Sequence, residues 1–286
     1  MIQAGHDDIR KGEPFMHGRL EHAFSLSASI GMICPICGSP YVRQEQSLVC
    51  QKGHTVNGNR KGYFNFLSRP APDTYGKPLF EARQRVFHAG LYDSVMSAVF
   101  DEIQDGESVL DVGCGEGTYL HALAARGHGG RLAGVDISRQ GIEIASSGEA
   151  LFCVADMRHL PFAAHSFDTI LNILSPADYS EFRRVLKPSG KVIKVIPGPD
   201  YLKEVREVRH LKGGDSQADA RLKEKMHIHK TRHVYEMKAI DAGLWPDILQ
   251  MTPLNQDLTQ EQFRDMAKTP ARTLTIDLMI LTAFPG

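Results

Sequence analysis

The stretch Val109-Leu110-Asp111-Val112-Gly113-Cys114-Gly115-Glu116-Gly117 decides how this chain folds. An apolar run that contains one acidic residue leads directly into three glycines at every second position, and a helical pattern follows. A strand that passes through a glycine-rich turn into a helix is typical of the first βα unit of a doubly wound sheet, where nucleotide cofactors bind.

Strand and helix patterns alternate after this turn. We expect strands over residues 108–112, 131–136, 151–155, 169–174 and 191–196, helices over 117–126, 139–147 and 179–186, and two last strands over 233–239 and 274–284. Before the turn, helical spacing runs over residues 79–103 and is interrupted at Gly90. The pattern predicts an α/β fold with a doubly wound, mostly parallel, seven-stranded sheet of the Rossmann-like kind, closed by an antiparallel final strand.

The glycine turn favours S-adenosylmethionine over a dinucleotide. Gly113, Gly115 and Gly117 let the backbone approach a ligand, and Asp111 can accept a hydrogen bond from an amine. A dinucleotide loop has its third glycine later, and Glu116 would repel a pyrophosphate. We therefore expect the amino-acid end of S-adenosylmethionine to bind here.

Further cofactor contacts are expected at the ends of the next two strands. Asp136, with Ile137 beside it, is placed to accept hydrogen bonds from the two ribose hydroxyls. Asp156 and Met157 end the third strand and would meet the adenine, although Asp156 could instead cap a helix. The turn and Asp136 together identify the cofactor better than either alone.

A zinc site is indicated nearer the N-terminus. Cys34-Pro35-Ile36-Cys37 is followed by Cys50 and His54, which gives the spacing C-x2-C-x12-C-x3-H. Three thiolates and one imidazole complete a tetrahedron around zinc and leave no open position for water. We therefore expect a structural zinc rather than a catalytic one.

Composition sets outer limits. The 286 residues are 42% hydrophobic and 23% charged with a net charge of −1, as in an ordinary globular protein. No apolar run is long enough to cross a bilayer and no secretory leader is visible, so we expect a cytoplasmic protein. Five cysteines, three of them close together, favour metal ligands over disulfides.

Basic charge gathers beside the zinc motif. Between Arg43 and Arg85 there are eight basic residues and three acidic ones, a local excess of five positive charges. This excess would suit a phosphate-binding surface or a simple solvated face. The aromatic residues Tyr63, Phe64 and Phe66 could stack on RNA bases, but we expect at least one of them to belong to a core.

Turn residues divide the chain into three parts. Residues 1–31 show no sustained period and are treated as an N-terminal extension, which initiation at Met16 or Met32 would shorten without loss of a motif. Residues 32–75 form the zinc-binding module, and Pro70-Ala71-Pro72-Asp73 suits a linker. Residues 76–286 form the cofactor-binding domain.

From Cys34 to its end, the chain resembles the large-subunit (23S) ribosomal RNA guanine-N1 methyltransferases. The zinc motif joined to the glycine turn is the specific part of the likeness. Other shared segments are Lys61-Gly62-Tyr63-Phe64-Asn65-Phe66-Leu67, Ala89-Gly90-Leu91-Tyr92, Leu160-Pro161-Phe162, Ser175-Pro176, Arg184-Val185-Leu186-Lys187-Pro188, Ile196-Pro197-Gly198-Pro199 and Gln250-Met251-Thr252-Pro253.

This resemblance implies methylation of a guanine in a 23S rRNA hairpin loop, with the zinc module taking part in RNA recognition. Two branches of the family act on neighbouring guanines, and the runs over residues 178–186 and 193–197 are closer to the branch linked with tylosin resistance. The resemblance also implies cofactor contacts from Tyr92, Cys114, Gly115 and Tyr201, although some relatives have histidine at the position of Tyr201.

The chemistry would rest mainly on alignment of guanine N1 with the methyl carbon. The N1 proton must also leave, and Asn172 and Asp178 are the candidate catalytic residues, although Asn172 could be a turn residue. Two other functions stay open: a methyltransferase for a small molecule, and an inactive zinc-containing RNA-binding protein. A homodimer is compatible with the sequence.

Overall fold

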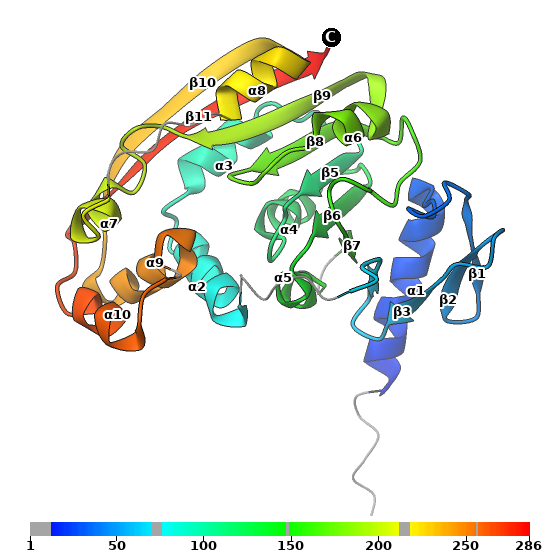
Figure 1. The fold of residues 1–286 in the computed structure, drawn as a ribbon, viewed down its shortest axis with the longest axis horizontal. Coiled ribbons are helices and arrows are strands. Elements are labelled where there is room, and N and C mark those ends of the chain that lie inside the picture. The colour runs from blue at the N-terminus through cyan, green and yellow to red at the C-terminus, as the bar shows by residue number, and fades with distance from the viewer. Residues whose placement is uncertain (1–12, 70–75, 147–148, 212–217, 256) are drawn as a thin grey trace, which may run out of the picture.

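The computed structural model describes residues 13–69, 76–146, 149–211, 218–255 and 257–286. Its centre is one mixed sheet of eleven strands in the order β1-β2-β3-β4-β7-β6-β5-β8-β9-β11-β10 (Figure 1). Within the described part of the chain, no helix is both long and apolar enough to cross a membrane.

Seven of these strands form the predicted doubly wound sheet. They are β5 (Val109–Val112), β6 (Leu132–Asp136), β7 (Leu151–Val154), β8 (Phe167–Ile173), β9 (Leu186–Pro197), β10 (Met226–Ala239) and β11 (Thr273–Pro285). Neighbours from β7 to β9 are parallel, and β11 runs antiparallel between β9 and β10. The predicted fold class is therefore confirmed, including the antiparallel last strand.

Helices cover both faces of this sheet. They are α2 (Lys77–His88), α3 (Asp93–Phe100), α4 (Thr118–Ala125), α5 (Arg139–Ala145), α6 (Tyr179–Val185), α7 (Lys203–Val208), α8 (Ala218–Lys225), α9 (Trp245–Met251) and α10 (Gln260–Ala267), with 3-10 turns at Ala242–Leu244 and Pro253–Asn255. The expected break between the first two helices lies at Gly90, whose φ is 77°. The strands Val109–Val112 and Leu151–Val154 are buried on both faces, as expected for central parallel strands.

The last strands are longer than their sequence pattern predicts. The strand β9 begins five residues before Lys191, and β10 begins at Met226 rather than at His233. Polar side chains dominate the first part of β10, so no apolar alternation marks it. Its pairing with β11 along nearly its whole length, from Met226 opposite Pro285 to Ala239 opposite Thr273, supplies the backbone hydrogen bonds instead.

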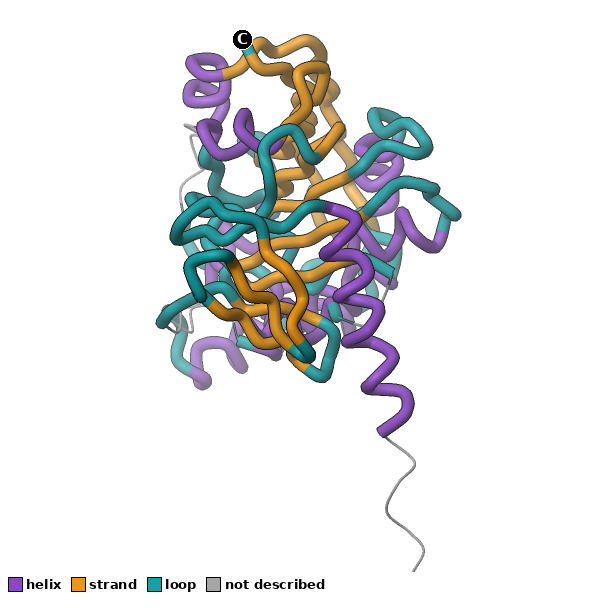
Figure 2. The backbone as a smooth tube through the Cα atoms, turned by 90° about the vertical axis from the view of Figure 1, so that its right-hand side faces the viewer, coloured by secondary structure: helices purple, strands orange, loops and turns teal. Residues whose placement is uncertain are grey.

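The N-terminal part joins the same sheet. It contains α1 (Glu13–Ile30), β1 (Tyr41–Gln44), β2 (Ser47–Cys50), β3 (Thr55–Asn59) and β4 (Tyr63–Asn65). The strand β4 pairs in parallel with β7, with Phe64 opposite Cys153, so the strands of the zinc module extend the sheet of the cofactor domain (Figures 1 and 2). The expected linker at residues 70–73 lies outside the described residues.

The helix α1 was not predicted, because its buried face is not purely apolar. Leu20, Phe24 and Ile30 are buried at helical spacing, but Ser27 lies between them. The hydroxyl of Ser27 donates a hydrogen bond to the carbonyl of Phe24, which satisfies it within the helix. The ring of Phe24 packs edge-on against Phe64, 5.2 Å between centroids, so the helix shares a core with the module.

Candidate cofactor and metal sites

The glycine turn lies where the strand order reverses, at the carboxyl ends of β5 and β8, which is where ligands bind in doubly wound sheets. Gly113, Gly115 and Gly117 have φ of 84°, 55° and 78°, values that favour glycine. A Cβ added at Gly113 would lie 2.5 Å from Ser175 Oγ, and one at Gly117 would lie 2.9 Å from Phe152 Cζ. Both the backbone conformation and the close packing therefore require glycine in this turn.

Asp111 is a buried carboxylate with unused hydrogen-bonding capacity. It is 2% exposed, and its Oδ1 is buried without a hydrogen-bond partner among the described residues. Burial raises the pKa of Asp111 well above its ordinary value, and the nearby Asp136 and Glu116 raise it further. An amine donor is what this oxygen lacks, so the residue fits the ammonium group of S-adenosylmethionine.

Asp136 is more than a surface acceptor at the end of β6. One of its oxygens accepts a hydrogen bond from Gly115 N at 2.8 Å, and the other accepts one from Ser138 N at 2.7 Å. Its carboxylate thus holds the glycine turn in place. Each oxygen retains a second lone pair, which is available to a ribose hydroxyl.

The other expected cofactor residues are either buried or are exposed or engaged with other parts of the protein. Tyr92 is buried, and its hydroxyl lies 2.8 Å from that of Tyr201. Cys114 is buried in the turn itself. By contrast, Ile137 is 43% exposed, Met157 is partly buried in the core, and Asp156 forms an ion pair with Arg158 at 2.6 Å.

Two residues of α2 that the sequence did not single out for the cofactor site lie over the glycine turn. A Cβ added at Gly115 would lie 3.1 Å from both Arg83 Nη1 and Phe80 Cε1. Arg83 Nη1 also lies 3.6 Å from Glu116 Oε2, a buried oxygen without a hydrogen-bond partner among the described residues. The count of basic residues had grouped Arg83 with a possible phosphate-binding surface. The helical spacing between Phe80 and Arg83, which puts both side chains on one face of α2, was the signal that could have distinguished Arg83 from the other cations.

The two catalytic candidates occupy structural positions. Asn172 is fully buried, and its Nδ2 donates to Val112 O at 2.9 Å and to Pro176 O at 2.9 Å. Asp178 caps α6, because its Oδ1 accepts from Ser180 N at 3.0 Å and from Glu181 N at 3.1 Å. An amide accepts no proton, and the carboxylate already holds a helix end.

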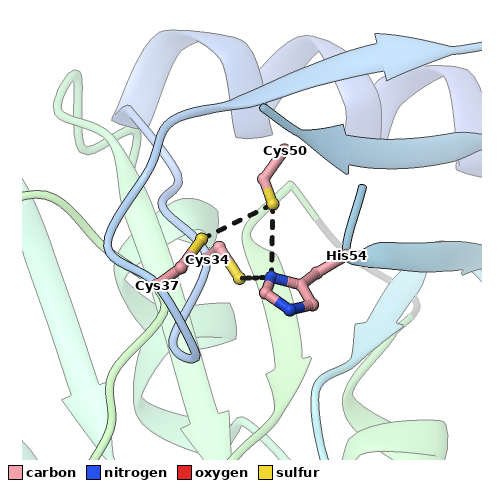
Figure 3. A group of neighbouring side chains, drawn as sticks. All are labelled: Cys34, Cys37, Cys50 and His54. Atoms are coloured by element: carbon pink, nitrogen blue, oxygen red, sulfur yellow. Dashed lines mark hydrogen bonds between the residues drawn. The ribbon is translucent and has the colours of Figure 1, made fainter. Parts of the chain in front are cut away.

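Cys34, Cys37, Cys50 and His54 converge on one point, and their ligand atoms lie within 4.8 Å of one another (Figure 3). The Nδ1 of His54 lies 3.5 Å from the sulfurs of Cys34 and Cys50, and the sulfurs of Cys37 and Cys50 are 3.6 Å apart. A tetrahedron with zinc–sulfur bonds of about 2.3 Å has edges of about 3.7 Å, whereas a disulfide would bring sulfurs to about 2.0 Å. The donor set and its spacing therefore fit zinc.

The thiol of Cys37 is prepared for metal binding. Hydrogen bonds from the backbone and side chain of Ser39 lower the pKa of Cys37 to about 6. The thiolate is the ligand form of cysteine. Cys34 and Cys37 lie in the loop before β1, Cys50 is the last residue of β2, and His54 lies in the turn between β2 and β3.

The basic segment is largely neutralised by carboxylates. Five of its eight cations form ion pairs, namely Arg43 with Glu21, Lys61 with Glu143, Lys77 with Glu81, Arg83 with Glu116 and Arg85 with Asp247. Lys52, Arg60 and Arg69 are exposed and have no ion pair among the described residues. Among the described residues of this segment, three cations on the zinc module therefore remain without an ion pair.

The aromatic run beside them is mostly core. Tyr63 is 1% exposed and Phe64 is fully buried, which confirms that part of this run packs inside the protein. Only Phe66 is partly exposed. Base stacking on Tyr63 or Phe64 is therefore excluded.

The doubly wound sheet, its glycine turn and the acidic residues around it define a methyltransferase that depends on S-adenosylmethionine. Residues 109–190 match the family model described as a methyltransferase domain, and residues 32–70 match the zinc-ribbon model described as RlmA, N-terminal. The Bacillus subtilis (strain 168) protein YxjB, named as a putative 23S rRNA (guanine-N(1)-)-methyltransferase, is 34% identical over 87% of this chain and 95% of its own length. The chain belongs to the 23S rRNA (guanine-N(1)-)-methyltransferase family.

A second relative carries a more specific name. The 23S rRNA (guanine(748)-N(1))-methyltransferase of Streptomyces fradiae is 27% identical, over 68% of this chain and 74% of its own length. Among solved structures, a geranyl diphosphate C-methyltransferase from Streptomyces coelicolor A3(2) superimposes with a TM-score of 0.45 and 13% identity, over 76% of this chain and 87% of that one.

Proposed function

We propose that this protein transfers a methyl group from S-adenosylmethionine to N1 of a guanine in a hairpin loop of 23S ribosomal RNA. The observation that supports this most directly is the combination of two sites on one sheet. The glycine turn follows β5, the strand that contains Asp111. The Cys34–His54 cluster lies beside β2 and β3, which join the same sheet through β4, the strand that pairs with β7. A methyltransferase for small molecules has no need of the second site.

The cofactor would be held by residues already close together. Asp111 would accept hydrogen bonds from its ammonium group, and Asp136 would accept them from its ribose hydroxyls. Arg83 would pair with its carboxylate while it remains beside Glu116. Tyr92 and Tyr201 would close the site beside them. When bound, S-adenosylmethionine supplies a methyl group on a sulfonium, which leaves readily.

The protein's own task is to orient the base and to allow the N1 proton to leave. A guanine in a hairpin loop can leave its stack at a lower cost than one in a duplex. Of the two catalytic candidates, Asn172 holds the wall of the site and Asp178 holds a helix end, so we propose positioning roles for both. The departing proton would pass to solvent.

RNA recognition would use the zinc module. Cys34, Cys37, Cys50 and His54 would hold a structural zinc, and Lys52 lies between two of these ligands in the β2–β3 turn. Arg60 and Arg69 add exposed cations to the same module. Because the substrate is ribosomal RNA, we place the protein in the cytoplasm.

Mapping of the modified nucleotide tests this function. The protein with bound zinc would be incubated with labelled S-adenosylmethionine and 23S rRNA, and the methylated nucleoside would be located by mass spectrometry of RNase fragments. We expect 1-methylguanosine at one hairpin-loop position, and the name of the Streptomyces fradiae relative makes guanine 748 the first position to examine. Transfer to small molecules but not to the RNA would refute the proposal.

A further inference from the structure

Lys194 is a buried cation at the edge of the proposed methyl-transfer site. It lies on β9, opposite Asn172 of β8 and Leu281 of β11, and it is 3% exposed. Its Nζ donates hydrogen bonds to Asn172 Oδ1 and to Ser175 O. No carboxylate of the described residues lies within ion-pair distance of it, although a buried ammonium without a counter-charge is costly.

Its two partners connect Lys194 to the glycine turn. Asn172 Nδ2 donates to Val112 O at 2.9 Å, and Ser175 Oγ donates to the same carbonyl at 3.0 Å. Val112 directly precedes Gly113, which has no room for a Cβ because Ser175 lies against it. Two successive hydrogen bonds therefore join the ammonium to the backbone that would carry the cofactor.

The same network holds a strained turn. Leu174 has a φ of 50°, a left-handed conformation that is unfavourable for a residue with a side chain. Its N–H donates to Val195 O at 3.0 Å, and its side chain is 41% exposed. Strain of this kind persists only where surrounding contacts enforce it, and here Lys194 binds the carbonyl of the next residue.

We propose that Lys194 is a positioning residue for methyl transfer, which fixes the turn from Asn172 to Ser175 at the carboxyl edge of the sheet and places a positive charge behind the target base. This inference rests on the proposed function. During transfer the N1–H bond breaks and its proton passes to water, the N1 electron pair forms the N–C bond, and the pair of the broken S–C bond stays on sulfur. Negative charge appears on N1 and O6 as the proton leaves, and a fixed cation favours it.

The ionisation of Lys194 follows from its surroundings. Burial alone lowers the pKa of Lys194 to about 8. Its neighbours on the adjacent strands are the uncharged Asn172 and Leu281, and the carboxylates of α6 are otherwise engaged, Asp178 with the helix end and Glu181 with Arg184. The cation is therefore present below pH 8 and lost as the pH rises through that value.

Three substitutions separate the parts of this proposal. Lys194→Gln keeps hydrogen-bond donors without the charge, Lys194→Met removes both, and Lys194→Arg keeps the charge. Each full-length protein with bound zinc would be assayed for kcat and KM with a transcript of the 23S rRNA hairpin from pH 6 to pH 9, and its affinity for S-adenosylmethionine would be measured by calorimetry. Lys187→Met, on the same strand at the opposite edge of the sheet, is the matched control.

We expect kcat at pH 7 to fall about 10-fold to 100-fold in Lys194→Gln and Lys194→Met, because each removes an electrostatic interaction with the transition state, and to be partly retained in Lys194→Arg. In Lys194→Gln, which keeps hydrogen-bond donors, the KM and the cofactor affinity should stay within about twofold, and the advantage of the unmodified enzyme over this variant should shrink above pH 8. Equal kcat in Lys194→Gln, or a loss that is independent of pH and accompanied by weaker cofactor binding, would overturn the inference. An unmodified enzyme that does not methylate the hairpin at all would instead refute the proposed function.

Discussion

At the scale of single residues, the cofactor site is built from carboxylates that the fold leaves unsatisfied. Asp111 and Glu116 each have a buried oxygen without a hydrogen-bond partner among the described residues, and burial raises the pKa of both. Such groups make the unliganded protein less stable than it would be without them. A bound ammonium group would remove much of this cost at Asp111, so part of the affinity for the cofactor would come from relief of an unfavourable state.

We expect Asp111→Asn to weaken the binding of S-adenosylmethionine by about 10-fold to 100-fold, because a charge-assisted hydrogen bond contributes about 1.5–3 kcal/mol. The unliganded protein should become more stable. The pKa of Asp111 is raised on folding, so its stability contribution is present at low pH and is lost as the pH rises above the ordinary aspartate range. Thermal unfolding of both proteins from pH 5 to pH 8 should therefore show a gain in Tm that grows with pH, and an equal Tm at all values would contradict the assignment.

At the scale of elements, the sequence predicts those parts of the fold whose pattern is local. The strands from β5 to β8 and the helices between them were predicted to within about two residues, because continuous apolar runs bounded by turn residues mark them in the sequence. The helix α1 and the first half of β10 were missed, since Ser27 interrupts one apolar face and polar residues fill the other segment. Both are held by contacts with distant segments, which no local pattern records.

In the candidate site, too, the sequence predicts only those residues that a local pattern marks. The four zinc ligands lie close together in the sequence, and so do the three glycines of the turn. Each set has a fixed spacing, so each could be recognised directly from the sequence. Arg83 and Lys194 reach the cofactor site only through the packing of α2 on the turn and the pairing of β9 with β8. Their roles depend on distant chain segments meeting in space.

The packing of α1 can be measured by removal of Phe24. We expect Phe24→Ala to lower the free energy of unfolding by about 3–5 kcal/mol, because the ring is 3% exposed and packs on Phe64. Urea denaturation gives this value, and Ser25→Ala, an exposed change on the same helix, should leave it within about 0.5 kcal/mol. An equally small effect of Phe24→Ala would mean that α1 is not part of the module core.

Loss of one zinc ligand should affect the module more than the cofactor site. We expect Cys37→Ser to release zinc, lower the Tm and abolish RNA methylation, because small modules depend on their metal for folding. The affinity for S-adenosylmethionine should change much less, since β6 and β7 separate β4 from the glycine turn. Metal analysis and calorimetry would check this, with Cys153→Ala as a variant that keeps zinc, and loss of cofactor binding together with zinc would show that the two sites are coupled.

At the scale of the whole molecule, one sheet joins the two sites, with the zinc module at one edge and the β10–β11 pair at the other (Figure 1). The pairing of β4 with β7 fixes the direction of the module relative to the glycine turn. Lys61 and Tyr63 strengthen this joint, because both bind Glu143 of α5. A module held in this way can present RNA to the catalytic edge in a constant orientation.

This arrangement identifies which cations are free to bind phosphate. Lys61 is committed to Glu143, whereas Lys52 and Arg60 are exposed and unpaired among the described residues. If they neutralise phosphates, the double substitution Lys52→Glu and Arg60→Glu should weaken binding to the 23S rRNA hairpin. The slope of log K against log salt should also flatten by about 0.7 for each single-strand phosphate that is no longer neutralised, because fewer counterions are released.

The measurement is a salt series of hairpin affinities, with methyl transfer followed in parallel. Cofactor affinity should not change, because neither residue contacts the glycine turn. Arg264→Glu on α10, at the far end of the molecule from the module, is a charge-reversal control and should leave both slope and affinity near those of the unmodified protein (Figure 1). If the double variant and the control give the same slope, the exposed cations of the zinc module do not bind the RNA backbone, and recognition must come from another surface.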